Sequence, residues 1–218
     1  RGLPLKSLKS LSRMTRLKRL DLGLSKVSDL RGLSALKALK NLSLDGSAVM
    51  DLTPLNTMTS LTSLDISWTS VSDLGPISSL VNLTTLKLHA LKILTIEPLR
   101  KLVNLKELDL GSTKISGLNP LRKMKKMERL FLRHTNIFEL KALKYMKHLR
   151  ELDIGGTGIV DIRVLYDKRR LKRLGLGGKV EPEQLWTLRK KNRTLEASVV
   201  QGELAPAYFE IRKRRGFD

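Results

Sequence analysis

The residues that could do chemistry in this 218-residue chain do not form a catalytic pattern. There is no cysteine, which excludes disulfides, thiol nucleophiles and thiolate metal sites, and three histidines argue against a histidine-rich metal centre. The run from Gly175 to Val180 resembles a phosphate-binding loop, but a Walker motif needs glycine and a hydroxyl residue where Arg173 and Val180 stand. No serine, histidine and acidic residue share the spacing of a triad. We therefore expect a protein that is not an enzyme and that binds no cofactor, metal ion or small-molecule substrate.

Positive charge is the main chemical feature of the chain. The 42 Lys and Arg residues exceed the 21 Asp and Glu residues, which gives a formal charge of +21. The charge is uneven, because residues 41–86 contain no Lys or Arg, whereas residues 96–150 contain 14 against five acidic residues. Self-repulsion of this size destabilises a folded protein without counter-charge, so we expect an anionic partner. The other interpretation is that the positive side chains form a solvated surface and have no anionic partner.

Leucine or a close substitute recurs every 22 residues from Leu17 to Leu171, without insertion or deletion. Counted from each of these residues as position 1, positions 4 and 6 are always apolar, and position 11 is Val or Ile in the first seven repeats. The pattern is L-x-x-L-x-L-x-x-T-x-I-x-x-L-x-x-L-x-x-L-x-x. Such a fixed period is typical of a solenoid, in which each repeat contributes one layer of a continuous core.

The period also predicts the structure of one repeat. Alternation at positions 3–7 indicates a short strand parallel to its neighbours, and the triplet spacing at positions 11, 14, 17 and 20 indicates an extended or 3₁₀ return. We expect an α/β solenoid with a curved parallel sheet, uninterrupted over residues 17–176. Ser or Thr at position 9, interrupted at Leu91, would satisfy the turn backbone, and Asp at position 13 would cap the next turn.

These repeats resemble the leucine-rich repeat family, in particular the 22-residue type of the protein phosphatase 1 regulatory subunit and the bacterial internalins. The match covers about residues 3–180, and the D-L-x-P-L motif of that type stands at 51–55, with a variant ending in Ile at 73–77. The family usually stacks asparagine at position 9, where this chain has Ser or Thr. Hydroxyl columns of this kind are similar to repeats of kinetoplastid protists.

The two ends differ from the repeats. We expect a partial repeat at 1–16, a solenoid of about eight repeats at 17–180, and a helical cap with a basic tail at 181–218. The helix is predicted from Pro182 to Asn192, and Leu195, Ala197 and Val199 alternate like a further strand. Because the first residues fall in the middle of a repeat, we also expect more chain before Arg1 in the biological protein.

The resemblance implies that the concave face, at strand positions 3, 5, 7 and 8, binds a protein partner. Large side chains at these positions are of the types that anchor interfaces. For Trp68, simple packing on its neighbours is the other interpretation. The residues predicted to contact protein are Trp68, His89, Phe131, Arg133 and His134.

Positions 21 and 22 place cations in columns that stacking turns into a stripe along one edge. Such a stripe can follow a phosphate backbone, and it neutralises phosphate without reading bases. The residues predicted to contact RNA are Lys125, Lys126, Lys147, His148, Arg169, Arg170, Lys190, Lys191, Arg212, Lys213, Arg214 and Arg215.

The sequence therefore favours a non-catalytic scaffold of a ribonucleoprotein, with protein on the concave face and RNA on the basic stripe. Repeat type and charge resemble leucine-rich repeat subunits of kinetoplastid mitochondrial ribosomes, which favours a mitochondrial location. The alternative is a protein-only adaptor, such as a phosphatase regulator or an internalin-like effector, which leaves a cytoplasmic or secreted location open. The apolar stretches are only a few residues long, so no contact with a membrane is expected.

Overall fold

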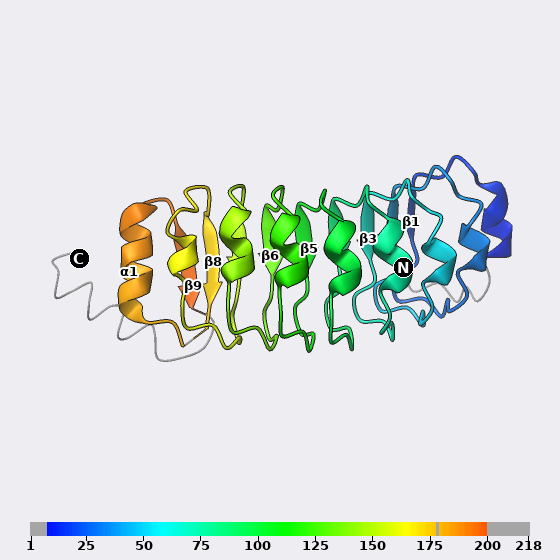
Figure 1. Cartoon of the computed structure of the whole chain (residues 1–218). Helices are drawn as coiled ribbons and strands as arrows, with labels where there is room; N and C mark the ends of the chain where they lie inside the picture. The colour runs from blue at the N-terminus through cyan, green and yellow to red at the C-terminus, as the bar shows by residue number, and fades with distance from the viewer. Residues whose placement is uncertain (1–7, 178, 200–218) are drawn as a thin grey trace.

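The computed structural model describes residues 8–177 and 179–199, which form one curved solenoid (Figure 1). Its nine strands make a single parallel sheet in chain order. Leu64 pairs with Leu86, and Leu86 with Leu108, so the expected 22-residue register is confirmed. The strands are β1 (Arg19–Asp21), β2 (Asn41–Ser43), β3 (Ser63–Asp65), β4 (Thr85–Lys87), β5 (Glu107–Asp109), β6 (Arg129–Phe131), β7 (Glu151–Asp153), β8 (Arg173–Leu176) and β9 (Glu196–Val199).

The repeat strands β1 to β7 occupy positions 3–5 and are shorter than the predicted positions 3–7. They end early because position 8 adopts a left-handed backbone, with φ between 55° and 66° from Leu24 to Gly156. Hydrogen bonds between coils nevertheless continue beyond the strands. The amide of Trp68, for example, donates to the carbonyl of His89 at 2.9 Å. The sheet edge at which the strands end is called the carboxyl edge below.

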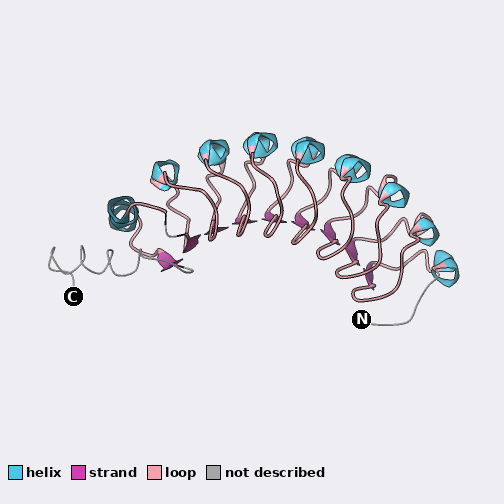
Figure 2. Ribbon diagram, turned by 90° about the horizontal axis from the view of Figure 1, so that it is seen from below, coloured by secondary structure: helices cyan, strands magenta, loops and turns pink. Residues whose placement is uncertain are grey.

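Each coil returns along the convex side through one 3₁₀ helix (Figure 2). The strands lie on the inner side of the arc and these helices on the outer side. An aspartate at position 13 caps the helix start, as expected: Asp51 accepts from the amide of Thr53 at 2.8 Å, and Asp161 from that of Arg163 at 2.9 Å. The helices are η1 (Lys9–Arg13), η2 (Arg31–Leu33), η3 (Thr53–Leu55), η4 (Gly75–Ser79), η5 (Glu97–Lys101), η6 (Asn119–Lys123), η7 (Lys141–Tyr145) and η8 (Arg163–Leu165).

The core lies between the sheet and the convex helices. Leu64, Leu86 and Leu108 are fully buried, and each such leucine contributes about 1.5–3 kcal/mol once its neighbouring coils are in place. The predicted hydroxyl column is present beside it. Thr113 Oγ1 donates to the carbonyl of Leu110 at 2.7 Å, and Thr135 Oγ1 to that of Leu132 at 2.7 Å. Each threonine thereby satisfies the carbonyl of the residue that directly follows its own strand.

The expected C-terminal helix is α1 (Pro182–Lys191), which buries Leu185 and Leu188 against the last coil. The expected further strand is β9, where Glu196 pairs with Arg173 at a spacing of 23 residues, one more than in the repeats. The last coil therefore has an α-helix in place of a 3₁₀ helix and is one residue longer than the repeats. The predicted basic tail at 212–215 lies outside the described residues, as does residue 178 of the glycine run.

Candidate functional site

Among the described residues, the cations predicted to bind RNA lie at the end of a convex helix or in the segment that leads from it to the next strand. These segments are 100–106, 122–128, 144–150, 166–172 and 188–193, and their exposed cations together are called the basic edge. The basic edge consists of Arg100, Lys101, Lys106, Arg122, Lys123, Lys125, Lys126, Lys144, Lys147, Arg150, Arg169, Arg170, Lys172, Lys190, Lys191 and Arg193.

The same segments of earlier coils show that this charge is not required by the fold. Residues 56–62 and 78–84 occupy the equivalent places and contain no charged side chain. Within the five segments of the basic edge, the carboxylates are only Glu128 and Asp167. The fold therefore tolerates a neutral edge at 56–62 and 78–84, whereas residues 12–18 and 34–40 carry cations at the equivalent places, as the later repeats do.

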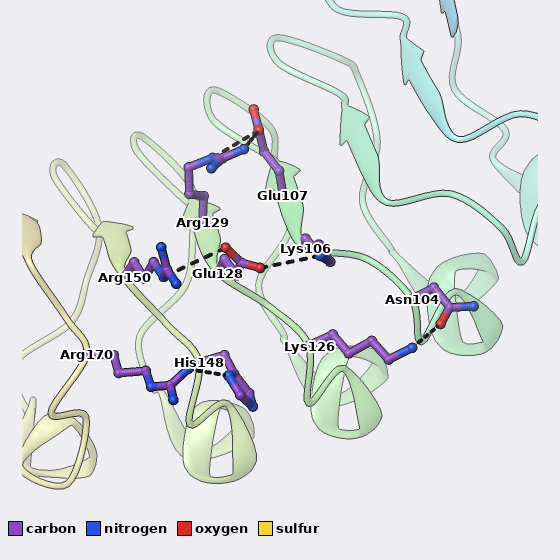
Figure 3. Close-up of polar contacts among 9 residues, drawn as sticks. All are labelled: Asn104, Lys106, Glu107, Lys126, Glu128, Arg129, His148, Arg150 and Arg170. Carbon is purple, nitrogen blue, oxygen red and sulfur yellow. Dashed lines mark hydrogen bonds and ion pairs between the residues drawn. The ribbon is translucent and has the colours of Figure 1, made fainter. Parts of the chain in front are cut away.

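Side chains of the basic edge reach back to the preceding coil (Figure 3). Lys126 Nζ donates to Asn104 Oδ1 at 2.7 Å, a contact between position 22 of successive repeats. Glu128 lies between Lys106 and Arg150, with N···O distances of 3.7 and 3.8 Å. Within the part of the chain that the structure describes, Lys125, Lys147 and Arg169 have no acidic partner, so their charges are open to an anion.

His148, which was also predicted to contact RNA, lies beside a cation of the basic edge. Its Nδ1 lies 2.9 Å from Nη1 of Arg170. A guanidinium can only donate, so Nδ1 is the acceptor of this hydrogen bond. His148 therefore helps to position Arg170 on the basic edge.

A buried lysine beneath the basic edge was missed by the sequence analysis. Position 20 is Leu or Met in the preceding repeats but Lys168 in this one, and its side chain is fully buried. The ammonium Nζ donates to the carbonyl of Lys144 at 2.9 Å and to Asp167 Oδ1 at 2.7 Å. The interruption of an otherwise apolar column was the signal that could have revealed it.

The concave face differs from the basic edge because the arginines and glutamates of strands β5 to β8 pair with one another. Arg129 forms an ion pair with Glu107 at 2.5 Å, and Arg173 with Glu151 at 3.2 Å, so acid and base alternate along the sheet. Asp109 at position 5 also accepts from the amide of Gly111 at 2.8 Å and so fixes the turn. The face is mixed in charge and open, as a surface for protein contacts would be.

The residues predicted to contact protein are divided between two places. Phe131 lies on strand β6, half-buried on the concave face, whereas the other four lie in turns at the carboxyl edge. Trp68 is 65% exposed, and its ring centroid is 5.3 Å from that of His89, whose Nδ1 is 3.5 Å from Asp109 Oδ1. His134 accepts at Nε2 from Arg133 Nε at 3.3 Å. Trp68 therefore packs on a neighbour and still offers most of its surface to solvent.

No helix in residues 8–177 and 179–199 is long and apolar enough to cross a bilayer. The same residues include no group of three or more His, Cys, Asp or Glu side chains placed to hold a metal ion.

The repeat, the parallel sheet and the convex helices give this chain the fold of a leucine-rich repeat solenoid, a scaffold suited to protein–protein interaction. The leucine-rich repeat family profile matches residues 57–75. No curated protein sequence matches the chain.

Solved structures of internalins are similar to the chain. Internalin C2 of Listeria monocytogenes is 25% identical, with 79% of this chain and 76% of that chain covered and a TM-score of 0.77. A second internalin of that organism (inlF) is 22% identical, with coverage of 93% and 68% and a TM-score of 0.77. A leucine-rich repeat protein of Leptospira interrogans is 21% identical, with coverage of 87% and 56% and a TM-score of 0.72. The predicted resemblance to internalin-type repeats is thus confirmed.

Proposed function

We propose that the protein is a non-catalytic scaffold of a ribonucleoprotein that binds RNA phosphates along the basic edge and a protein partner on its concave face. The observation that supports RNA binding most strongly is the basic edge itself. It presents sixteen exposed cations beside two carboxylates, while the equivalent segments at 56–62 and 78–84 are uncharged.

These cations form a row, which matches a chain of evenly spaced phosphates better than it matches single anions at scattered places. Successive coils are about 4.8 Å apart at the sheet, so one or more cations per coil form a continuous row. Contact with about four to six phosphates predicts that log affinity for single-stranded RNA falls with log salt at a slope near 3 to 4. Phosphate contacts of this kind do not depend on base sequence.

The test is charge reversal on the basic edge. Lys125→Glu, Lys147→Glu and Arg169→Glu together should weaken RNA binding for all sequences and flatten the salt slope, as measured by fluorescence anisotropy of a labelled RNA. The matched control is Lys26→Glu, Lys92→Glu and Lys114→Glu. These three exposed lysines lie at position 10, beyond the carboxyl edge, and their reversal changes the net charge equally.

The proposal requires that the control triple variant keep most of the wild-type affinity for RNA, whereas the triple variant of the basic edge loses it. Equal loss in both would mean that net charge, and not the basic edge, attracts RNA. Trp68→Ala and Phe131→Ala should leave RNA affinity unchanged, because neither side chain belongs to the basic edge. Loss of RNA binding in Trp68→Ala would contradict the proposal.

A protein-only adaptor is the second candidate, and the similarity to internalin C2 favours it. The concave face with its paired charges and Phe131 would then be the main surface. In that case Phe131→Ala should weaken capture of the partner from native lysate after nuclease treatment, and the purified protein should not bind RNA.

A further inference from the structure

Aromatic rings lie among the cations at the C-terminal half of the basic edge. Lys144 Nζ is 5.6 Å from the ring centroid of Tyr145, Lys191 Nζ is 5.8 Å from that of Tyr166, and Lys190 Nζ is 5.3 Å from that of Trp186. Tyr145 is 47% exposed, and Tyr166 and Trp186 are half-buried. Each ring thus stands beside its own ammonium group.

The rings lie on three successive coils, at neighbouring but different repeat positions. Tyr145 lies at the end of η7, Tyr166 just after η8, and Trp186 on α1, so three successive coils supply one ring each. Six Phe, Tyr and Trp side chains occur in the described residues, and three of them are here. The other three are Trp68, Phe131 and Phe138.

We infer that the basic edge binds single-stranded RNA in preference to duplex, with unpaired bases stacked on Tyr145, Tyr166 and Trp186. This inference rests on the proposed function, since it specifies the form of RNA that the basic edge takes. In a duplex the base faces are hidden inside the stack, and only phosphate and sugar meet the protein. A single strand exposes its bases, which stack on aromatic rings irrespective of sequence.

The neighbouring lysines explain how one surface serves both contacts. In the free protein each ammonium is held near a ring by cation–π attraction, which is modest at exposed sites. A base that stacks on the ring displaces the ammonium, which then pairs with the adjoining phosphate. Each ring and lysine therefore bind one nucleotide together, by stacking and by charge.

The sequence offers a direct optical test, because Trp68 and Trp186 are its only tryptophans. The variant Trp68→Phe leaves Trp186 as the single tryptophan. Titration with an unstructured 12-nucleotide RNA should quench the emission of Trp186, whereas the same strand annealed to its complement should quench it little. Quenching that is equal for both forms would overturn the stacking arrangement.

Affinity measurements separate stacking from charge. Tyr145→Leu should weaken single-strand binding by about five- to a hundred-fold while leaving duplex affinity and the salt slope unchanged. The matched control is Phe138→Leu, at an aromatic ring that is 63% exposed beyond the carboxyl edge, and it should leave both affinities unchanged. Circular dichroism shows whether each variant is folded. A Tyr145→Leu protein that is folded and binds the single strand normally would contradict the inference.

The outcomes distinguish this inference from the proposed function. If neither RNA form binds, the proposed function fails together with the inference. If both forms bind equally and Trp186 is not quenched, phosphate binding stands and the preference for single strands is wrong. If polyglutamate binds as tightly as RNA at equal charge, again without quenching, the basic edge is a site for an acidic protein, and both are wrong.

Discussion

Lys168 illustrates how a single residue in this repeat array depends on its neighbours. Its ammonium is fully buried, and its two acceptors, the carbonyl of Lys144 and the carboxylate of Asp167, come from the preceding coil and the adjacent residue. Burying the ammonium costs desolvation that its two acceptors only partly offset, and Asp167 itself is exposed, so this contact adds little net stability. Methionine fills the same position at Met124 and Met146 without any partner.

The first prediction follows from this comparison. Lys168→Met should leave the free energy of unfolding unchanged or raise it by about 1 kcal/mol, because an apolar side chain of similar length replaces a desolvated charge. Lys168→Ala should lower it by about 2–4 kcal/mol, because a cavity opens in the core. Urea unfolding followed by circular dichroism measures both. A strong loss of stability in Lys168→Met would show that the buried pair stabilises the fold.

A second prediction at the residue scale concerns pH. The hydrogen bond from the Arg163 side chain, with that from its amide, lowers the pKa of Asp161 to about 2. A carboxylate with a lowered folded-state pKa stabilises the protein above its unfolded pKa of about 3.9 and loses this effect as the pH falls towards 2. Asp161→Ala should therefore lower the free energy of unfolding by about 0.5–1 kcal/mol at pH 7.

The difference between wild type and Asp161→Ala should shrink steadily between about pH 4 and pH 2. Urea unfolding of both proteins at a series of pH values gives this difference directly. A difference that stays constant down to pH 2 would mean that the cap acts by shape and not through its charge.

At the scale of the element, the left-handed turn after each strand limits the sheet. From Leu24 to Gly156, position 8 has positive φ in every repeat, and only Gly46 and Gly156 are of the residue type that adopts this conformation freely. For other residue types the left-handed conformation costs about 1–2 kcal/mol. At Gly156 a side chain is also excluded by contact, because a Cβ would come within 2.3 Å of His134 Nδ1.

The third prediction tests this turn. Ser112 is exposed with φ of 57°, so Ser112→Gly should raise the free energy of unfolding by about 0.5–1 kcal/mol. Ser116 is also exposed, but its backbone is not left-handed. Ser116→Gly should therefore lower the free energy of unfolding by a similar amount. Thermal or urea unfolding checks both. Equal destabilisation in the two variants would show that position 8 is not strained.

The 22-residue period was sufficient to predict the elements of the solenoid but not their finer geometry. It gave the register of Leu64 against Leu86, the caps at position 13 and the threonine column, because stacking forces equivalent residues into equivalent environments. The shortened strands were not predictable, since φ at position 8 is imposed by the stacked turns and the residue type there varies from Leu24 to His134.

The candidate site was predicted less completely. The cation columns place Lys125, Lys147 and Arg169 correctly on one edge, as the period requires. The contact of His148 with Arg170 and the cation–π pair of Lys191 with Tyr166 depend on side-chain contacts between coils, which a column of residue types does not show.

For the whole molecule, the dominant property is the separation of charge along the solenoid. Residues 41–86 have four acidic and no basic side chains, while the net charge of the chain is +21. Cations on successive coils of the basic edge lie within one Debye length of each other at ordinary salt, so their repulsion opposes folding.

The fourth prediction is that salt stabilises the protein. Raising sodium chloride from about 10 mM to 300 mM shortens the Debye length several-fold and screens the repulsion, so the melting temperature should rise. A gain of 1 kcal/mol corresponds to about 2–4 °C for a domain of this size. The triple variant Lys125→Glu, Lys147→Glu and Arg169→Glu should show a smaller rise. A melting temperature that falls with salt would mean that attractive ion pairs dominate the charge balance.

The central claim, that the basic edge joins this scaffold to RNA, is tested most directly in native material. The protein would be purified from its own cells at low salt and sedimented before and after treatment with ribonuclease. We expect it to sediment with RNA at low salt and to be released by ribonuclease or by high salt, since phosphate contacts are both RNA-dependent and salt-dependent. Sedimentation that is unchanged by ribonuclease and salt would contradict the claim and establish a complex held together by protein contacts alone.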